Sequence, residues 1–202
     1  TDSTSSINIM KLNYTLDSSS IYSMNLSGTV TEIIKTGNNK FGLIGKSTDK
    51  SYYLLYDSDT SNVSEVINFK NYNSNSNITN DISLSDIAID KYNNKYIVGY
   101  FEDYGIITGK RSLIANKTYN NTNVSSHTGK TPFIIKYDNR NRRKWAYALN
   151  DINNISNIAM ECDSEYIYIN CIAGSLLFRY KWNIDTLPNY ITSYVSPITF
   201  PD

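Results

Sequence analysis

SDIAIDKYNNKYIVGY, at residues 85–100, is the stretch that decides the fold, because two variants of it occur elsewhere in the chain. Residues 156–170 read SNIAMECDSEYIYIN, and residues 31–45 read TEIIKTGNNKFGLIG. Each copy holds an apolar run, a short turn rich in Asn, Gly or Asp, and a second run of apolar and aromatic residues. A phrase repeated at this length indicates a repeat architecture, which outranks any single-residue signal.

A second phrase follows each copy and predicts further strands. It reads YYLLYDSD at residues 52–59, FIIKYDNR at residues 133–140 and LLFRYKWN at residues 176–183. Laid in register, the two phrases divide the chain into three units of four strands, at about residues 28–70, 82–149 and 152–196. Residues 7–27 match only the second half of a unit, so we expect a half unit of two strands there.

These units predict an all-β fold: a β-propeller built of four-stranded antiparallel blades, with three full units and an N-terminal half blade. Strand formers such as Ile, Tyr, Val and Thr are abundant, and no segment has a sustained helical period. Residues 37–39 (GNN) and 93–94 (NN) tolerate positive φ in tight turns. A β-sandwich is the alternative fold, but it does not require one phrase to recur in the same order.

The second unit also carries a family pattern. The residues that match it are Ile87, Ala88, Asp90, Asn94, Tyr96, Val98, Gly99, Phe133, Ile135, Lys136, Asp138, Trp145 and Ala146. This pattern resembles the bacterial SBBP repeat, a repeat of seven-bladed β-propellers. The resemblance covers most of the chain and is closest over residues 81–170. It implies a propeller and no reaction, since such repeats are known mainly as structural or binding modules.

The other units depart from the family pattern. The first has Ile33, Ile34, Lys35 and Thr36 in place of Ile-Ala-Ile-Asp, and it has no Trp at the position of Trp145. The third loses the Gly that follows the second strand. The resemblance is therefore carried mainly by the second unit.

The composition of the chain limits the kinds of partner that it is expected to bind. The chain has 19 basic and 19 acidic residues, so no global field draws it to nucleic acid or to an anionic membrane. No apolar stretch is long enough to predict a transmembrane helix. Asn, Ile, Lys and Tyr, which have AT-rich codons, are frequent, and this composition resembles that of propeller proteins from giant DNA viruses and AT-rich bacteria. We expect a location in a virion, or a secreted or cell-surface location.

The two cysteines are predicted to be free thiols. Cys162 and Cys171 flank one predicted hairpin, in which the partner of Cys162 is near Tyr166. Cys171 lies several residues further along the return strand, beyond the Cα separation of about 7 Å that a disulfide tolerates. Free thiols suit a reducing compartment.

Strand order predicts where the long loops gather. The loop between the second and third strands of a unit lies at the same end as the link between units, and this end holds residues 71–81 and an insertion at residues 104–131. Long loops in compact repeats are often functional. The candidate partner-binding residues of the insertion are Lys110, Arg111, Lys117, His127 and Lys130. The alternative interpretation is a solvated loop whose charges keep it soluble.

The opposite end holds a second basic cluster, formed by Arg140, Arg142, Arg143 and Lys144. Binding of single-stranded nucleic acid requires aromatic side chains on which bases can stack beside the charges. No such platform is assigned to this cluster from the sequence, so an exposed turn is the plainer interpretation, and we do not expect nucleic acid as the partner.

Catalytic patterns are not found. There is one histidine, no Gly-x-Ser-x-Gly motif, no zinc-ligand spacing and no Gly-rich phosphate loop. A Cys–His pair is not expected, because both thiols lie far from His127 in any plausible register. Paired carboxylates for glycoside cleavage could be drawn from Asp81, Asp86 and Asp151, which are also placed to cap turns.

These observations predict a non-enzymatic structural or binding module with no cofactor and no metal. Three and a half blades do not obviously close a ring, so we expect a protein partner or self-association within a larger assembly, such as a virion or a cell-surface structure. The alternative is a recognition module that binds a peptide or glycan through residues 104–131. A propeller glycosidase is the weaker alternative.

Overall fold

A computed structural model describes most of the chain as antiparallel β-strands. The residues described are 7–12, 18–24, 28–47, 50–71, 82–102, 105–108, 111–114, 130–149, 155–185 and 192–197. The regular elements in these residues are all strands, and every pair of neighbours is antiparallel, so the prediction of an all-β fold is confirmed.

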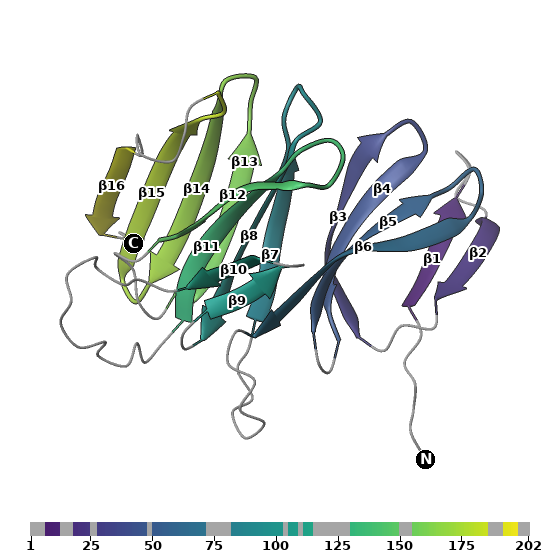
Figure 1. Ribbon diagram of the computed structural model, residues 1–202, viewed down its shortest axis with the longest axis horizontal. Coiled ribbons are helices and arrows are strands. Elements are labelled where there is room, and N and C mark those ends of the chain that lie inside the picture. The colour runs from purple at the N-terminus through teal and green to yellow at the C-terminus, as the bar shows by residue number, and fades with distance from the viewer. Residues whose placement is uncertain are drawn as a thin grey trace, which may run out of the picture.

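The strands form a hairpin and three larger sheets (Figure 1). The N-terminal hairpin consists of β1 (Ile7–Leu12) and β2 (Ser18–Met24). Sheet 1 contains β3 (Thr29–Gly37), β4 (Lys40–Lys46), β5 (Ser51–Asp57), β6 (Asn62–Asn71), β9 (Gly105–Thr108) and β10 (Arg111–Ile114). Sheet 2 contains β7 (Ile82–Ile89), β8 (Lys95–Glu102), β11 (Lys130–Tyr137) and β12 (Arg143–Ala148). Sheet 3 contains β13 (Asn157–Cys162), β14 (Tyr166–Ala173), β15 (Leu176–Asn183) and β16 (Thr192–Pro197).

The four strands expected in each full unit lie together in one sheet and follow chain order across it. Residues 7–12 and 18–24 form a separate two-stranded ladder, in the region where a half unit was expected. No ladder between the described strands joins the three sheets into a closed barrel. The repeat in the sequence is therefore a repeat of four consecutive antiparallel strands, to which β9 and β10 are added in sheet 1.

The insertion at residues 104–131, expected to be a long loop of the second unit, contains two strands instead. β9 and β10 form a hairpin, and β9 pairs with β6 of sheet 1, with Phe69 opposite Thr108. An outer strand such as β6 offers unpaired backbone groups along its free edge. The short runs GIIT and RSLI supply strand-forming residues that can pair there.

The three sheets are stacked face to face, with sheet 2 in the middle (Figure 1). β7, the first strand of sheet 2, contacts β3 and β4 of sheet 1 on one side and β13 of sheet 3 on the other. The first strands of the three sheets are therefore neighbours. The N-terminal hairpin lies beyond sheet 1, on the side away from sheet 2 (Figure 1).

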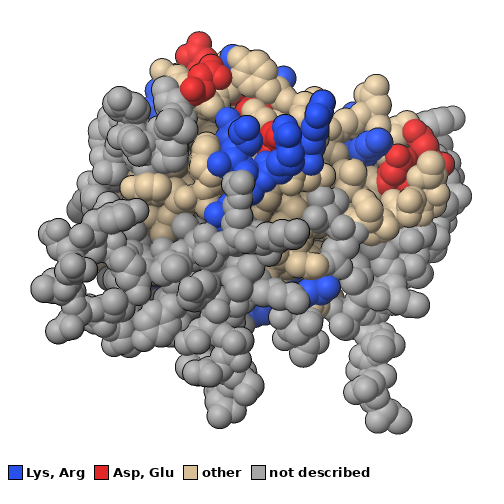
Figure 2. All heavy atoms as spheres, viewed as in Figure 1, with Lys and Arg blue, Asp and Glu red and all other residues tan. Residues whose placement is uncertain are grey.

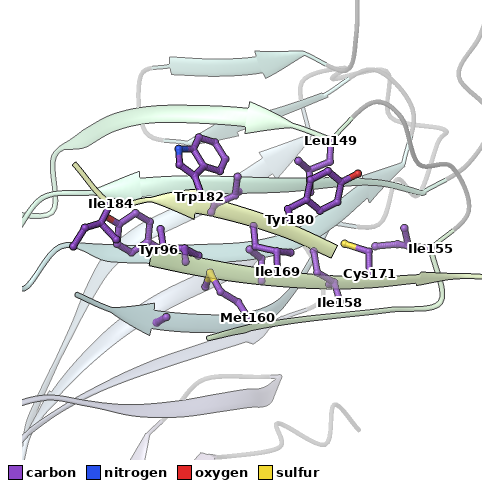
Figure 3. Close-up of a cluster of buried hydrophobic side chains, with 14 residues drawn as sticks. Tyr96, Leu149, Ile155, Ile158, Met160, Ile169, Cys171, Tyr180, Trp182 and Ile184 are labelled. Atoms are coloured by element: carbon purple, nitrogen blue, oxygen red, sulfur yellow. The ribbon is translucent and has the colours of Figure 1, made fainter. Parts of the chain in front are cut away.

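Apolar side chains fill the space between neighbouring sheets. Between sheets 1 and 2, the buried residues include Ile44, Tyr53, Phe69, Leu84, Ile97, Phe101, Phe133 and Ile135. Between sheets 2 and 3 they include Tyr96, Val98, Ile134, Ile158, Met160, Ile169, Cys171, Tyr180 and Trp182, many of which are labelled in Figure 3. Each large aliphatic or aromatic side chain buried in this way contributes about 1.5–3 kcal/mol. Sheet 2 is consequently buried on both faces.

The far face of sheet 3 has a different character. Along β13, burial alternates strictly, with Ile158 and Met160 buried and Ala159 and Glu161 exposed. Asn170, Arg179 and Lys181 of the next two strands are also exposed. An antiparallel sheet with one face on the core and one in water shows this period of two. The far face of sheet 3 is therefore polar, whereas both faces of sheet 2 are apolar.

Candidate functional site

The turns between the first and second strands of each sheet, and between the third and fourth strands of sheets 1 and 2, lie at one end of the molecule, the upper end in Figure 1, which we call the turn end. The connections β3–β4, β5–β6, β7–β8, β11–β12 and β13–β14 all lie there, as the expected strand order requires. The turn end holds the basic cluster, and its geometry is set by aspartates.

Asp138 builds the turn between β11 and β12. Its Oδ1 accepts hydrogen bonds from the backbone N–H groups of Arg140 (3.0 Å) and Arg142 (2.9 Å), and its Oδ2 accepts from Nε of Arg142 (2.8 Å). Nη2 of Arg142 lies 2.7 Å from the same oxygen. Burial alone would raise the pKa of Asp138, but these hydrogen bonds and the Arg142 charge outweigh it and hold the pKa below its usual range.

Asp90 has the same role between β7 and β8. Its Oδ1 accepts from the N–H groups of Tyr92 (2.8 Å) and Asn94 (2.9 Å). Its Oδ2 accepts from Nδ2 of Asn94 (2.8 Å) and from the hydroxyl of Tyr96 (2.9 Å). In both turns the third residue after Asp is an Asn with positive φ, 60° at Asn93 and 59° at Asn141. The signal for these turns is present in the sequence as Asp-x-x-Asn at residues 90–93 and 138–141.

Asp163 caps the turn between β13 and β14 with less burial. Its Oδ1 accepts from the N–H groups of Glu165 (2.7 Å) and Tyr166 (2.6 Å), and its Oδ2 from the hydroxyl of Tyr168 (3.0 Å). The two backbone hydrogen bonds lower the pKa of this carboxyl. The three aspartates are acceptors within their own turns, which explains their positions without any catalytic role.

The basic cluster lies on the β11–β12 turn and the first residues of β12. Arg140, Arg142 and Lys144 are exposed, and Arg143 is half-buried. Figure 2 shows Lys and Arg side chains gathered over this turn and the start of β12. The Arg142 charge is paired with Asp138, although its side chain remains 67% exposed. Arg140 and Lys144 form no ion pair with a carboxylate of the described residues.

Aromatic side chains follow the basic cluster directly, but they are used for packing. Trp145 stacks on Trp182 of sheet 3, with ring centroids 4.7 Å apart and ring planes 10° apart. Tyr147 meets the edge of Trp182 at 5.9 Å, and Tyr96 lies 6.0 Å from Trp145. Trp182 is only 1% exposed, whereas Tyr147 is 38% exposed. These rings hold β12 against sheet 3, so a stack of bases on Trp145 would compete with Trp182.

Of the five candidate residues of the insertion, the structure describes Arg111 and Lys130. Arg111 is the first residue of β10. Lys130 is the first residue of β11, and its ammonium lies 4.6 Å from the centroid of the Tyr100 ring. Lys110, Lys117 and His127 lie outside the described residues.

Two polar contacts join sheet 2 to sheet 3. Asp86 accepts a hydrogen bond from the N–H of Met160 through Oδ2 (2.7 Å) and from the N–H of Ile87 through Oδ1 (2.7 Å). Lys136 donates from Nζ to the carbonyl oxygen of Ile184 (3.0 Å). Burial raises the pKa of Asp86, against the two hydrogen bonds, and burial lowers the pKa of Lys136, against the charges of Asp90 and other neighbours.

Of the three carboxylates considered for glycoside cleavage, Asp86 already accepts hydrogen bonds from backbone N–H groups of β7 and β13. Asp81 and Asp151 lie outside the described residues.

Both cysteines are free thiols, as predicted. Cys162 lies opposite Ile167 and Cys171 lies opposite Ile158, so four ladder positions separate them. Burial raises the pKa of Cys171 to about 12. Burial and the charges of Asp90 and Asp163 raise the pKa of Cys162 to about 11. Both are therefore thiols at neutral pH and poor nucleophiles.

In the described part of the chain, no three His, Cys, Asp or Glu side chains are grouped as a metal site would require. The described residues contain no helix with the length and apolar character needed to cross a membrane. No protein-family model matches the sequence, and no curated protein matches it either.

Proposed function

We propose that this chain is a non-enzymatic binding or scaffolding module, made of β-propeller blades that belong to a larger assembly such as a virion or a cell-surface structure. The observation that carries the proposal is the position of β7, which contacts β3 of sheet 1 and β13 of sheet 3. Propeller blades are four-stranded antiparallel sheets whose first strands lie together around an axis, with neighbouring blades packed face to face.

The use of the buried polar groups supports a binding role rather than catalysis. The carboxylates of Asp90 and Asp138 accept hydrogen bonds from backbone N–H groups and neighbouring side chains. The carboxylate of Asp86 accepts a hydrogen bond that joins sheet 2 to sheet 3. Catalytic carboxylates for glycoside cleavage must instead be free to contact the substrate, one as an acid and the other as a base or nucleophile.

Sedimentation equilibrium over a range of protein concentrations tests the proposal. The monomer has a mass of 23.0 kDa, and we expect a larger species whose population rises with concentration or with addition of the native partner. A compact monomer at every concentration, with no partner recovered by cross-linking in its source, would contradict the assembly role.

A second candidate is recognition of a peptide or glycan through the insertion, and one observation favours it. The start of the insertion is held to sheet 1 through β9, and its end is held to sheet 2 through Lys130 and the rest of β11. Residues 115–129 therefore connect two anchored strands. A variant in which a short Gly-Ser linker replaces residues 115–129 keeps β9, β10 and β11. Loss of ligand binding with unchanged sedimentation would favour recognition, and unchanged binding would reject it.

A further inference from the structure

β12 is the outer strand of sheet 2. It pairs with β11 on one side, from Phe133 opposite Ala148 to Tyr137 opposite Arg143, and it is the last strand of the sheet. β10 of sheet 1 comes close to β12, but among the described strands β10 pairs only with β9. The other edge of β12 has no paired strand among the described residues, although β10 approaches it, and an unpaired edge of this kind can accept an added strand.

The same edge carries a concentrated positive charge. Residues 138–144 read DNRNRRK, which holds four basic residues and one acidic residue, a net charge of about three. Since Asp138 neutralises Arg142, the charges presented at the turn end of β12 belong chiefly to Arg140 and Lys144. Figure 2 shows this patch on the surface of the molecule.

We propose that the edge of β12 binds an extended acidic segment of a partner protein, which adds to sheet 2 as a strand and places its carboxylates near Arg140 and Lys144. This inference rests on the proposed function, because it names the kind of partner that the module binds. Strand addition supplies main-chain hydrogen bonds, and charge complementarity supplies selectivity and a faster encounter.

The packing of the aromatic rings favours a peptide over single-stranded nucleic acid. Trp145 stacks on Trp182, and its ring also contacts Tyr96, so its face is not free for a base. Lys and Arg at a sheet edge disfavour pairing with other strands in general, and they repel strands that carry basic residues. A strand that carries carboxylates is instead attracted by these positive charges.

The first test uses a fluorescent peptide of alternating Glu and Val, long enough to span the six residues of β12. We expect fluorescence anisotropy to detect binding that weakens with added salt. The double variant Arg140→Glu/Lys144→Glu should bind about tenfold more weakly, because two attractive contacts become repulsive. The matched control Lys35→Glu/Arg179→Glu reverses two exposed charges on β3 and β15 and should bind as the unchanged protein does. No binding, or equal loss in both variants, would overturn the inference.

The second test separates strand pairing from simple charge attraction. Two versions of the peptide are N-methylated at odd or at even positions. Because alternate residues of an antiparallel strand point their N–H groups to opposite sides, only one version loses the donors that face β12. We expect that version to bind about tenfold more weakly than the other. Equal binding of the two versions would reject strand addition.

Two further measurements complete the test. If a single-stranded oligonucleotide of the same charge binds and the acidic peptide does not, the inference is wrong. Sedimentation of the double variant separates this inference from the proposed function. If the assembly persists although the acidic peptide does not bind, only the binding of a strand at the edge of β12 is rejected.

Discussion

Asp90 and Asp138 illustrate how single side chains shape the turn end. Each carboxylate accepts hydrogen bonds from two backbone N–H groups and from neighbouring side chains, across a turn whose fourth residue is an Asn with positive φ. Asn tolerates this conformation better than other non-Gly residues. The basic cluster is presented on such a turn, so its geometry depends on an acidic residue.

We expect Asp90→Ala to lower the free energy of unfolding by about 2 kcal/mol, because it leaves donors near a buried turn without an acceptor. Asp90 is only 5% exposed, and the Tyr96 hydroxyl that it binds is buried with it. Urea unfolding followed by circular dichroism measures the loss. Glu165→Ala is the matched control: this exposed turn residue should change stability by less than about 0.5 kcal/mol. Equal effects of the two variants would show that the carboxylate does not hold the turn.

The pH dependence of stability provides a second prediction at this scale. The pKa of Asp138 is lowered in the folded protein, so its contribution is present above the unfolded pKa, near 4, and is lost as the pH falls through the folded pKa. The difference in urea midpoint between the unchanged protein and Asp138→Asn should therefore be largest near neutral pH and shrink below about pH 4. For Asp86 the change of stability with pH has the opposite sign: because burial raises its pKa in the folded protein, its contribution to stability falls as the pH rises. A difference that grows as the pH falls would contradict this account of Asp138.

At the scale of elements, the first two strands of the units share an irregularity. The ladder between β3 and β4 shifts between Val30 and Glu32, and the ladder between β7 and β8 shifts between Leu84 and Asp86. A glycine lies opposite each shift, Gly45 in β4 and Gly99 in β8.

The glycines leave room for a backbone carbonyl. A Cβ at Gly45 would lie 2.2 Å from the carbonyl oxygen of Thr29, and a Cβ at Gly99 would lie 2.0 Å from that of Ser83. By sequence alignment the third unit has Asn170 instead of this Gly, and the ladder between β13 and β14 has no shift. The Gly that the third unit lacks is therefore needed only where the neighbouring strand bulges.

This relation predicts that Gly99→Ala lowers the free energy of unfolding by about 2–3 kcal/mol, because β7 must move away from β8 to admit the methyl group. The control is Gly37→Ala, where a Cβ meets nothing within 4 Å. We expect that control to change stability by less than about 1 kcal/mol. The midpoint of thermal or urea unfolding measures both variants, and similar losses would contradict the bulge explanation.

At the scale of the whole molecule, sheet 2 is the centre of the stack. It is covered by sheet 1 on one face and by sheet 3 on the other, whereas the far face of sheet 3 is polar and exposed. Repeat arrays distribute stability in this way when each sheet depends on its neighbours to bury its apolar faces.

The rates of backbone hydrogen exchange should reflect how far each sheet is covered by its neighbours. We expect backbone amides of β8 and β11 to exchange more slowly than those of β14 and β15, because sheet 3 can open from one side while sheets 1 and 2 stay packed. All four strands have a paired strand on each side, so the comparison isolates the effect of packing. Exchange measured by mass spectrometry on peptides from these strands tests the prediction, and faster exchange in β8 and β11 would refute it.

Much of the strand pattern was predictable because its signals are local. Alternating apolar residues, and turns such as those at residues 37–39 and 93–94, specify where strands begin and end within a few residues. The assignment of Cys162 and Cys171 as free thiols followed from the same ladder geometry. The basic cluster was also visible, since its four residues lie within five positions of one another.

What only the tertiary structure decided are contacts between residues far apart in the chain. The pairing of β9 with β6, the hydrogen bond from Met160 to Asp86 and the stack of Trp145 on Trp182 each depend on how one sheet lies against another. Local patterns carry no information on that register, because the faces of stacked sheets meet through packing rather than through neighbouring positions in sequence. The repeat by itself determined the runs of four antiparallel strands, and the stacking of the sheets decided which aromatic rings are packed and which charges are exposed.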